Sequence, residues 1–376
     1  MKLAVIVTGG LHPSGREQVV PSWLTLFSEL ATMHEVHAFV LRHFPEARSY
    51  TLLGFHVHDL GRPSAPLGLS RWAQQRALAA AMSAHGRFDV IHGIWGDPAG
   101  QLAVRMGKRF SRPAVATFDS GEFESMPAID YGSQRTSRGR AAIGEALTAS
   151  RVHVCSEFMA AKARQHGVTP IVIPLTTVRG ASTGTGIREP GSGRTLRLLQ
   201  VASLSRVKNQ QLLIDAVAQV ASSIDVQLDL VGEDTLGGEL QRHATAIGVG
   251  NRVRFHGFKT QSELAPFYAA ADIYIQSSVH EAAGVSVLEA AAAGVPVIGT
   301  RAGYVADWAP DRAIAIDSPN ADAMADAIVA LHGDPNRAGA IASQAKAWVL
   351  ERDASWVATR FDALYRETAA AVLAGC

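Results

Sequence analysis

Two glutamates, Glu281 and Glu289, stand eight positions apart in the stretch HEAAGVSVLEAAAAGVPVIGT, where the other residues after the histidine are small or apolar. A charged group is costly to bury without a partner, so the two carboxylates either stay in water or face something polar. Carboxylates accept hydrogen bonds from hydroxyl groups, and a helix that starts between them would bind phosphate at its free N–H groups. Hydroxyls on both sides of a phosphate group describe a nucleotide sugar. Two solvated carboxylates are the alternative.

The elements around the pair would place it at the edge of a sheet. DIYIQSS is predicted to be a buried strand, so Glu281 lies in the strand-to-helix loop that follows it. A helix is expected over about 285–293, ended by a glycine and a proline, with Glu289 in its second turn. Gly284, just before that helix, permits close approach of the backbone to a ligand.

Strand and helix patterns alternate along the whole chain, which is typical of doubly wound α/β sheets. Residues 3–7 are continuously apolar, as in a parallel strand buried on both faces. The stretch TTVRGASTGTGIREPGSGRT interrupts the alternation and is interpreted as a linker between domains. The sequence therefore predicts two Rossmann-like domains that face a central cleft, at the carboxyl ends of their strands. The expected segments are residues 1–175, the linker 176–195, residues 196–352, and a helix over 353–376 with one apolar stripe.

Composition excludes several classes of protein. The 376 residues are 47% hydrophobic and 18% charged, and the net charge of +1 creates no field that would recruit nucleic acid. The two cysteines, Cys155 and Cys376, form no metal-binding spacing and suit a reducing compartment. We find no apolar run long enough for a signal peptide or a membrane span, so we expect a cytoplasmic protein and leave peripheral membrane contact open. No Asp-x-Asp pair occurs, so no catalytic metal and no cofactor are expected.

Further candidates follow predicted strands in the first domain. HGIWGDPAG places His92 and Trp95 at the expected cleft, where the indole could stack on a sugar or simply close the edge of the core. Gly10 in TGGLHPSG could approach donor phosphates or form a tight turn. Three arginines in SQRTSRGR could hold an anionic or lipid-phosphate acceptor, or could be solvated: Arg135, Arg138 and Arg140.

The stretch SSVHEAAGVSVLEAAAAGVPVIGT resembles the signature of the retaining glycosyltransferases of family 4, which have the GT-B fold. In that family the signature reads roughly S-x-x-E-G-F-G-L-x-x-L-E-A-M-A-x-G-x-P-V. MHEV, FDVIHGIWGDPAG and VASLSRVKNQQLLIDA also have counterparts there, so the resemblance extends over nearly the full chain. It implies that the first domain takes the acceptor, the second takes the nucleotide-sugar donor, and the helix over 353–376 crosses back to the first domain.

The resemblance also implies roles for single residues. Glu281 would meet hydroxyls of the donor sugar, and Glu289 would meet the ribose of the nucleotide. The ammonium group of Lys208 would neutralise the leaving diphosphate, although its local sequence alone also fits an exposed lysine at a helix start. The backbone that opens the helix would hold the diphosphate, at Gly284, Val285 and Ser286.

Two of the chain's departures from the family pattern concern candidate site residues. Ser203 stands where many members have an arginine, so Arg206 is a candidate for the second phosphate contact. Asp119 stands where many members have a histidine near the acceptor. Sequences that read G-G-E followed by a Tyr-Gly pair match SGEF and DYG here, which makes Glu122 and Tyr131 acceptor-side candidates. A hydrogen-bonded loop carboxylate is the alternative for Glu122.

The activity that the resemblance implies is transfer of a hexose, with retention, from a UDP- or GDP-linked sugar to a hydroxyl of a glycan, a lipid-linked sugar or a small molecule. A same-face displacement, in which the leaving diphosphate takes the acceptor proton, is expected because no enzyme nucleophile is evident. A nucleotide-sugar epimerase of the same fold and a non-catalytic scaffold are the alternatives.

Overall fold

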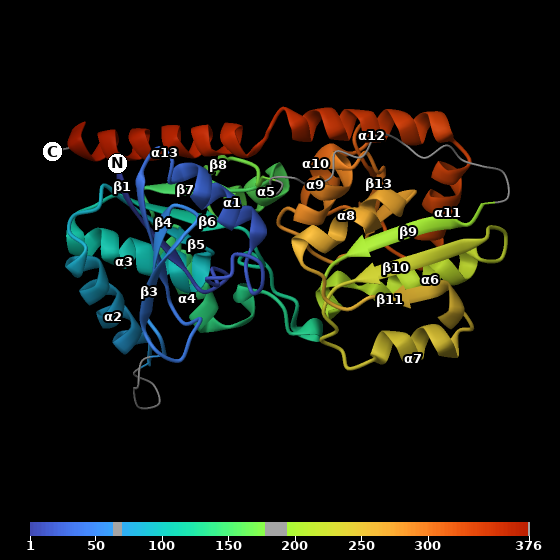
Figure 1. The fold of residues 1–376 in the computed structure, drawn as a ribbon, viewed down its shortest axis with the longest axis horizontal. Coiled ribbons are helices and arrows are strands. Elements are labelled where there is room, and N and C mark those ends of the chain that lie inside the picture. Colours follow the sequence, from blue (N-terminus) through green and yellow to red (C-terminus); the bar gives the residue numbers. More distant parts are fainter. Residues whose placement is uncertain (63–69, 177–193, 375–376) are drawn as a thin grey trace. The chain divides into compact units, whose positions relative to one another are not determined.

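The computed structural model describes residues 1–62, 70–176 and 194–374, which form two compact units (Figure 1). Unit 1 comprises Met1–Leu175 together with Ala354–Cys376, and unit 2 comprises Thr176–Asp353. The predicted linker, apart from residues 176, 194 and 195, lies outside the described residues. No helix within these three ranges has the length and apolar character needed to cross a membrane.

Unit 1 is built on an eight-stranded sheet of order β3-β4-β2-β1-β5-β6-β7-β8, parallel except for the antiparallel pair β3–β4. The strands are β1 (Lys2–Val7), β2 (Glu35–Val40), β3 (Arg48–Leu52), β4 (Phe55–Asp59), β5 (Val90–Ile94), β6 (Ala114–Phe118), β7 (Arg151–Val154) and β8 (Ile171–Val172). The helices are α1 (Pro21–Leu30), α2 (Ser70–Ala84), α3 (Gln101–Phe110), α4 (Ser137–Ala146), α5 (Glu157–Gln165) and α13 (Ala354–Ala374). The apolar run in β1 is fully buried, as its lack of alternation predicts.

Helix α13 belongs to unit 1, although the rest of that unit is formed by residues 1–175. It packs against α1 and β5, and the apolar stripe predicted from the sequence provides the contact. Phe361 and Tyr365 are fully buried, whereas Trp356 at the start of the stripe is half-buried. The Phe361 ring lies edge-on to Trp23 of α1, with ring centroids 6.4 Å apart.

Unit 2 is built on a six-stranded, all-parallel sheet of order β11-β10-β9-β12-β13-β14. The strands are β9 (Leu196–Val201), β10 (Val226–Val231), β11 (Val253–Phe255), β12 (Ile273–Gln276), β13 (Val297–Thr300) and β14 (Ile314–Ile316). The helices are α6 (Gln210–Val220), α7 (Glu239–Ala246), α8 (Gln261–Ala270), α9 (Val285–Ala292), α10 (Gly303–Trp308), α11 (Ala321–His332) and α12 (Pro335–Leu350). The predicted architecture of two parallel-sheet α/β domains is therefore confirmed.

Candidate functional site

In unit 2 the loop between β12 and α9 carries the first glutamate of the pair, and α9 carries the second. Gly284 has a φ of +91° and directs the chain into α9, whose N-cap has no side-chain hydrogen bond. The loop is fixed from the side by α10, because Tyr304 N donates to Ala283 O at 2.8 Å. A Cβ at Gly303 would lie 2.3 Å from that same oxygen, so the close approach requires glycine.

Glu289 lies in the second turn of α9, as predicted, and its side chain is buried with 5% exposure. The Tyr268 hydroxyl donates to one carboxylate oxygen at 2.6 Å, and Gln261 Nε2 donates to the other at 2.8 Å. Burial raises the pKa of Glu289 because neither neutral donor replaces the lost hydration fully. The solvated alternative is therefore wrong for Glu289.

Glu281 and Lys208 meet although 73 residues separate them. Lys208 Nζ lies 2.6 Å from Glu281 Oε1, with the two side chains 24% and 14% exposed, and Ser278 Oγ donates to the same oxygen at 2.7 Å. The loops that carry them are joined by the backbone, because Val279 N donates to Val207 O at 2.8 Å. The structure thus brings the predicted sugar-binding carboxylate and the predicted diphosphate-binding lysine together.

The other predicted donor-side residues of unit 2 lie at the start of α9 and at Arg206. Gly284, Val285 and Ser286 are all partly exposed at the start of α9, where the first N–H groups of a helix have no partner within it. Tyr274 OH donates to Ser286 Oγ at 2.6 Å. Arg206 instead pairs with Glu239 in an exposed bidentate contact at 2.6 and 2.5 Å.

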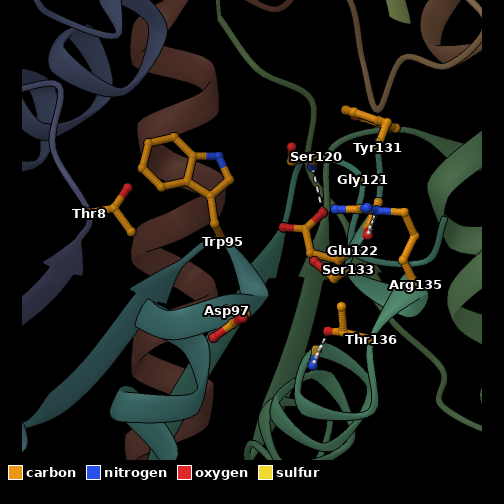
Figure 2. A pocket seen from close by; sticks show the side chains of 12 residues that line it. Thr8, Trp95, Asp97, Ser120, Gly121, Glu122, Tyr131, Ser133, Arg135 and Thr136 are labelled. Atoms are coloured by element: carbon orange, nitrogen blue, oxygen red, sulfur yellow. Dashed lines mark hydrogen bonds between the residues drawn. The ribbon is translucent and has the colours of Figure 1, made fainter. Parts of the chain in front are cut away.

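Unit 1 contains a pocket of about 430 Å³ beyond the carboxyl ends of β1, β5 and β6 (Figure 2). Trp95 lies on one side of it, and Glu122, Tyr131 and Arg135 lie on the other. The lining residues are Thr8, Trp95, Asp97, Ser120, Gly121, Glu122, Tyr131, Gly132, Ser133, Arg135, Thr136 and Gly139.

Glu122 organises the loop that forms one wall of this pocket. Its carboxylate accepts hydrogen bonds from the backbone N–H groups of Gly96 at 3.1 Å, Asp119 at 3.3 Å and Ser120 at 2.6 Å. Burial raises the pKa of Glu122, although these backbone bonds act in the opposite direction. The alternative of a hydrogen-bonded loop carboxylate therefore describes Glu122, and the residue lines the pocket as well.

The predicted SGE and Tyr-Gly segments meet in the same wall. The ring of Tyr131 lies so close to Gly121 that a Cβ there would be 2.7 Å from ring carbons. Arg135 pairs with Asp130 and donates from Nε to Gly132 O at 3.2 Å. Trp95, with a φ of +71°, lines the pocket half-buried, so its predicted position beside a strand end is confirmed.

The predicted placement of His92 is wrong. His92 lies within β5 and is 1% exposed, and its ring is held between Tyr365 OH at 2.8 Å and Thr117 Oγ1 at 2.7 Å. Burial lowers its pKa well below the ordinary histidine value. The ring is thus a neutral core group that joins the sheet to α13.

Other first-domain candidates already have partners inside unit 1. Asp119 accepts from Trp23 Nε1 at 3.2 Å and Cys155 Sγ at 3.0 Å, and it is absent from the pocket lining. Gly10 has a φ of +82°, and its carbonyl accepts from Val20 N at 3.0 Å, which fits the tight-turn alternative. The side chains of Arg138 and Arg140 are exposed.

Comparison with known proteins identifies both units. The family described as "Glycosyl transferases group 1" matches residues 189–348, and the "Glycosyl transferase 4-like domain" matches residues 19–176. D-inositol 3-phosphate glycosyltransferase of Pseudarthrobacter chlorophenolicus is 28% identical over 290 residues, which are 70% of this chain and 68% of that protein.

Two solved structures share the fold over the whole chain. Sucrose-phosphate synthase of Thermosynechococcus elongatus has a TM-score of 0.79 and 20% identity, over 99% of this chain and 100% of that one. Anabaena Alr3699/HepE in complex with UDP-glucose has a TM-score of 0.74 and 20% identity, over 98% and 100%.

Proposed function

We propose a specific reaction for this chain, which belongs to the family 4 glycosyltransferases with the GT-B fold. As a glycosyltransferase it uses a nucleotide-sugar donor. The proposed reaction is transfer of a hexose from UDP or GDP to an acceptor hydroxyl, with retention of the anomeric configuration.

The buried carboxylate of Glu289 carries the proposal on the donor side. Each of its oxygens already accepts one hydrogen bond from a neutral donor, and each retains a lone pair for a ribose hydroxyl. Within the part of the chain that the structure describes, Glu289 forms no ion pair, and a buried carboxylate without a cation costs stability. A bound diol that donates hydrogen bonds to the carboxylate would offset this cost. Anabaena Alr3699/HepE, which shares the fold, was solved with UDP-glucose and supports a uridine nucleotide as the first candidate.

The proposed chemistry places Lys208 and the start of α9 against the diphosphate. The ammonium group has three N–H donors, of which Glu281 takes one, so donors remain for phosphate oxygens. As the bond from the anomeric carbon to the phosphate oxygen breaks, the acceptor oxygen bonds to that carbon on the same face. The acceptor proton passes to the departing phosphate oxygen, while Lys208 and the α9 N–H groups stabilise the charge that develops there.

The acceptor is proposed to bind in the pocket of unit 1. Trp95 and Tyr131 offer aromatic faces for a sugar ring, and Asp97 and Arg135 offer polar contacts to hydroxyls or a phosphate. The Pseudarthrobacter relative is described as acting on D-inositol 3-phosphate, which makes a small phosphorylated polyol a first acceptor to assay beside sugars and lipid-linked sugars.

A calorimetric panel of UDP, GDP, ADP and their sugar conjugates tests the donor side. Glu289→Ala should weaken the one nucleotide that binds by about 1–3 kcal/mol, the scale for a lost hydrogen bond to a charged group. Glu351→Ala, which removes an exposed carboxylate from the same unit, is the control and should leave binding unchanged. Equal binding by wild type and Glu289→Ala would remove Glu289 from the donor site.

Product analysis separates transfer from the two alternatives. An epimerase would convert the donor alone, and a scaffold would consume no donor with any acceptor. Transfer with retention predicts a glycoside whose anomeric proton coupling by NMR matches that of the donor sugar. The matches of both units to glycosyltransferases favour transfer over either alternative.

A further inference from the structure

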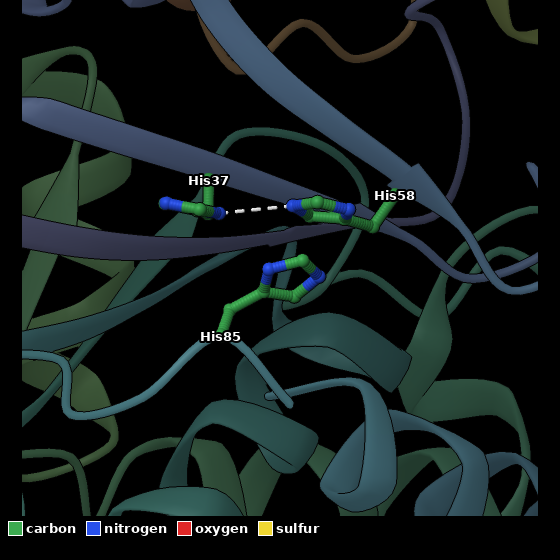
Figure 3. Close-up of side chains that lie close together, drawn as sticks. All are labelled: His37, His58 and His85. Atoms are coloured by element: carbon green, nitrogen blue, oxygen red, sulfur yellow. Dashed lines mark hydrogen bonds between the residues drawn. The ribbon is translucent and has the colours of Figure 1, made fainter. Parts of the chain in front are cut away.

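Three histidines from three different segments of unit 1 lie together (Figure 3). His37 comes from β2, His58 from β4, and His85 directly follows the end of α2. One ring nitrogen from each lies within 4.8 Å of the others, and His37 and His58 are 5% and 7% exposed. None of the three lines the unit 1 pocket, so glycosyl transfer gives no reason for the cluster.

Strand pairing explains how the sheet gathers these rings on one face. Side chains alternate between the two faces of a strand, so residues two apart share a face. His37 lies opposite His56 in the parallel register of β2 and β4, and His58 is two residues beyond His56. The ring of His85 stacks on His58, with centroids 4.0 Å apart, and closes the cluster from the helix side.

A chain of hydrogen bonds fixes the protons of two rings. Glu35 Oε1 accepts from His37 Nε2 at 3.0 Å, so Nδ1 of the neutral His37 ring carries a lone pair. That Nδ1 lies 2.9 Å from His58 Nε2, which must therefore donate to it. The remaining nitrogen of His58, Nδ1, accepts from Ser49 Oγ at 3.1 Å.

We propose that His37, His58 and His85 bind a divalent transition-metal ion of the zinc class through one nitrogen each. Imidazole nitrogens are the ligands that Zn²⁺, Ni²⁺ and Cu²⁺ favour. Zinc–nitrogen bonds of about 2.0–2.1 Å in a tetrahedron place the nitrogens roughly 3.3 Å apart. The 2.9 Å pair must open slightly and His85 must move inward.

The partner of the His37 ring matches that of a metal-bound histidine. Such histidines characteristically donate their second N–H to a carboxylate, and Glu35 already accepts from His37. His58 becomes a ligand when its proton moves from Nε2 to Nδ1 and the Ser49 hydroxyl turns to accept it. This exchange of tautomers releases no net proton from the pair.

The site would act as a clip between the sheet and α2 rather than in catalysis. It joins β2, β4 and the segment that follows α2, so a bound ion would stabilise unit 1. Glycosyl transfer is expected to need no metal ion, but that expectation concerns the proposed donor site in unit 2 and not this cluster in unit 1. A stack of three neutral imidazoles without a metal is the competing interpretation of the same geometry.

Two measurements test the proposal: calorimetry with Zn²⁺ and thermal unfolding. Both use the full chain without a histidine tag, after treatment with a chelator. Wild type should bind one Zn²⁺ per chain and should melt at a higher temperature with it. His85→Ala, which changes a partly exposed residue at the end of a helix, should weaken Zn²⁺ binding by at least about 100-fold and abolish the rise in Tm. Glu35→Gln should weaken binding by about 10–100-fold, the range for a group that orients a metal-bound histidine.

His56→Ala is the matched control, because the exposed His56 ring lies 4.8 Å from His37 and is outside the cluster. It should bind Zn²⁺ as wild type does. The proposal is overturned if wild type binds no Zn²⁺, or if His85→Ala binds it as tightly as wild type. An equal loss in His56→Ala and His85→Ala would overturn the assignment of these three ligands. Circular dichroism without metal verifies that each variant is folded.

Discussion

At the scale of single residues, Glu289 combines a proposed role in binding the donor with a cost in stability. Its raised pKa means that the folded chain holds this proton more tightly than the unfolded chain does. The free energy of unfolding therefore falls as pH rises from the ordinary glutamate pKa, about 4.3, through the raised one. Glu289→Gln stays neutral and should be more stable than wild type at pH 7, with the difference vanishing below about pH 4.

Urea unfolding of both proteins across this pH range provides the measurement. Glu351→Gln, at an exposed carboxylate, should show no such growth of the difference with pH. If Glu289→Gln were less stable than wild type at every pH, the buried carboxylate would be a net stabiliser instead.

Lys208 is predicted to act on the departing diphosphate. Lys208→Ala should lower kcat/KM by about 10²–10³-fold, the range for removing one preorganised donor from a developing anion. The unfolding midpoint should change little, because a partly exposed ion pair contributes little to stability. Arg206→Ala should cost much less activity, since Arg206 is paired with Glu239 in solvent. Equal losses in steady-state assays of the two variants would contradict a special role for Lys208.

The positions of the residues proposed for the donor side could be predicted from the sequence, whereas their hydrogen-bond partners could not. The glutamate pair and Lys208 belong to motifs, and their positions follow from strand ends. Tyr268 and Gln261 hold Glu289 from a different helix, and no local pattern marks them. His92 was misplaced because its partner Tyr365 is 273 residues away, so a buried histidine looked like a loop residue.

At the scale of elements, the wall of the unit 1 pocket depends on Gly121 leaving room for Tyr131. In Gly121→Ala the new methyl group would push the Tyr131 ring away, so KM for the acceptor should rise while nucleotide binding in unit 2 is unchanged. Gly144→Ala in α4 is the control: its Cβ meets nothing within 4 Å, so it should add up to about 1 kcal/mol of helix stability. A KM for the acceptor that stays constant in both variants would place the acceptor elsewhere.

Alternation of strand and helix was readable because each buried parallel strand is a short apolar run between amphipathic helices. The hairpin β3–β4 was not predicted. Its strands follow one another without a helix, and they are joined by Leu53 and Gly54, both with positive φ. The two histidines of FHVHDL are two residues apart and therefore share one face of β4, and the histidine of EVHAF lies on the paired strand β2. This spacing is the signal from which the cluster could have been found.

At the scale of the whole molecule, the two units should fold differently when each is produced as a separate fragment. Residues 194–353 contain a complete parallel sheet with its helices, so this fragment should unfold cooperatively and retain nucleotide binding. Residues 1–175 lack α13 and should not fold until residues 354–374 are attached through a flexible linker. Thermal unfolding and calorimetry of the purified fragments measure both outcomes. A stably folded 1–175 fragment would show that α13 is dispensable.

On the ribosome the N-terminal domain usually folds first. Here α13 belongs to unit 1 but follows unit 2 in the sequence, so unit 1 cannot be completed before unit 2 has been translated. The first 175 residues emerge early and then wait while residues 176–353 are translated, on the order of ten to forty seconds at about 5–20 residues per second. During that wait Trp23 and the face of β5 that α13 contacts have no covering helix, and unit 2 is fully translated before unit 1. The nascent first half is therefore the part of this protein that most needs a chaperone.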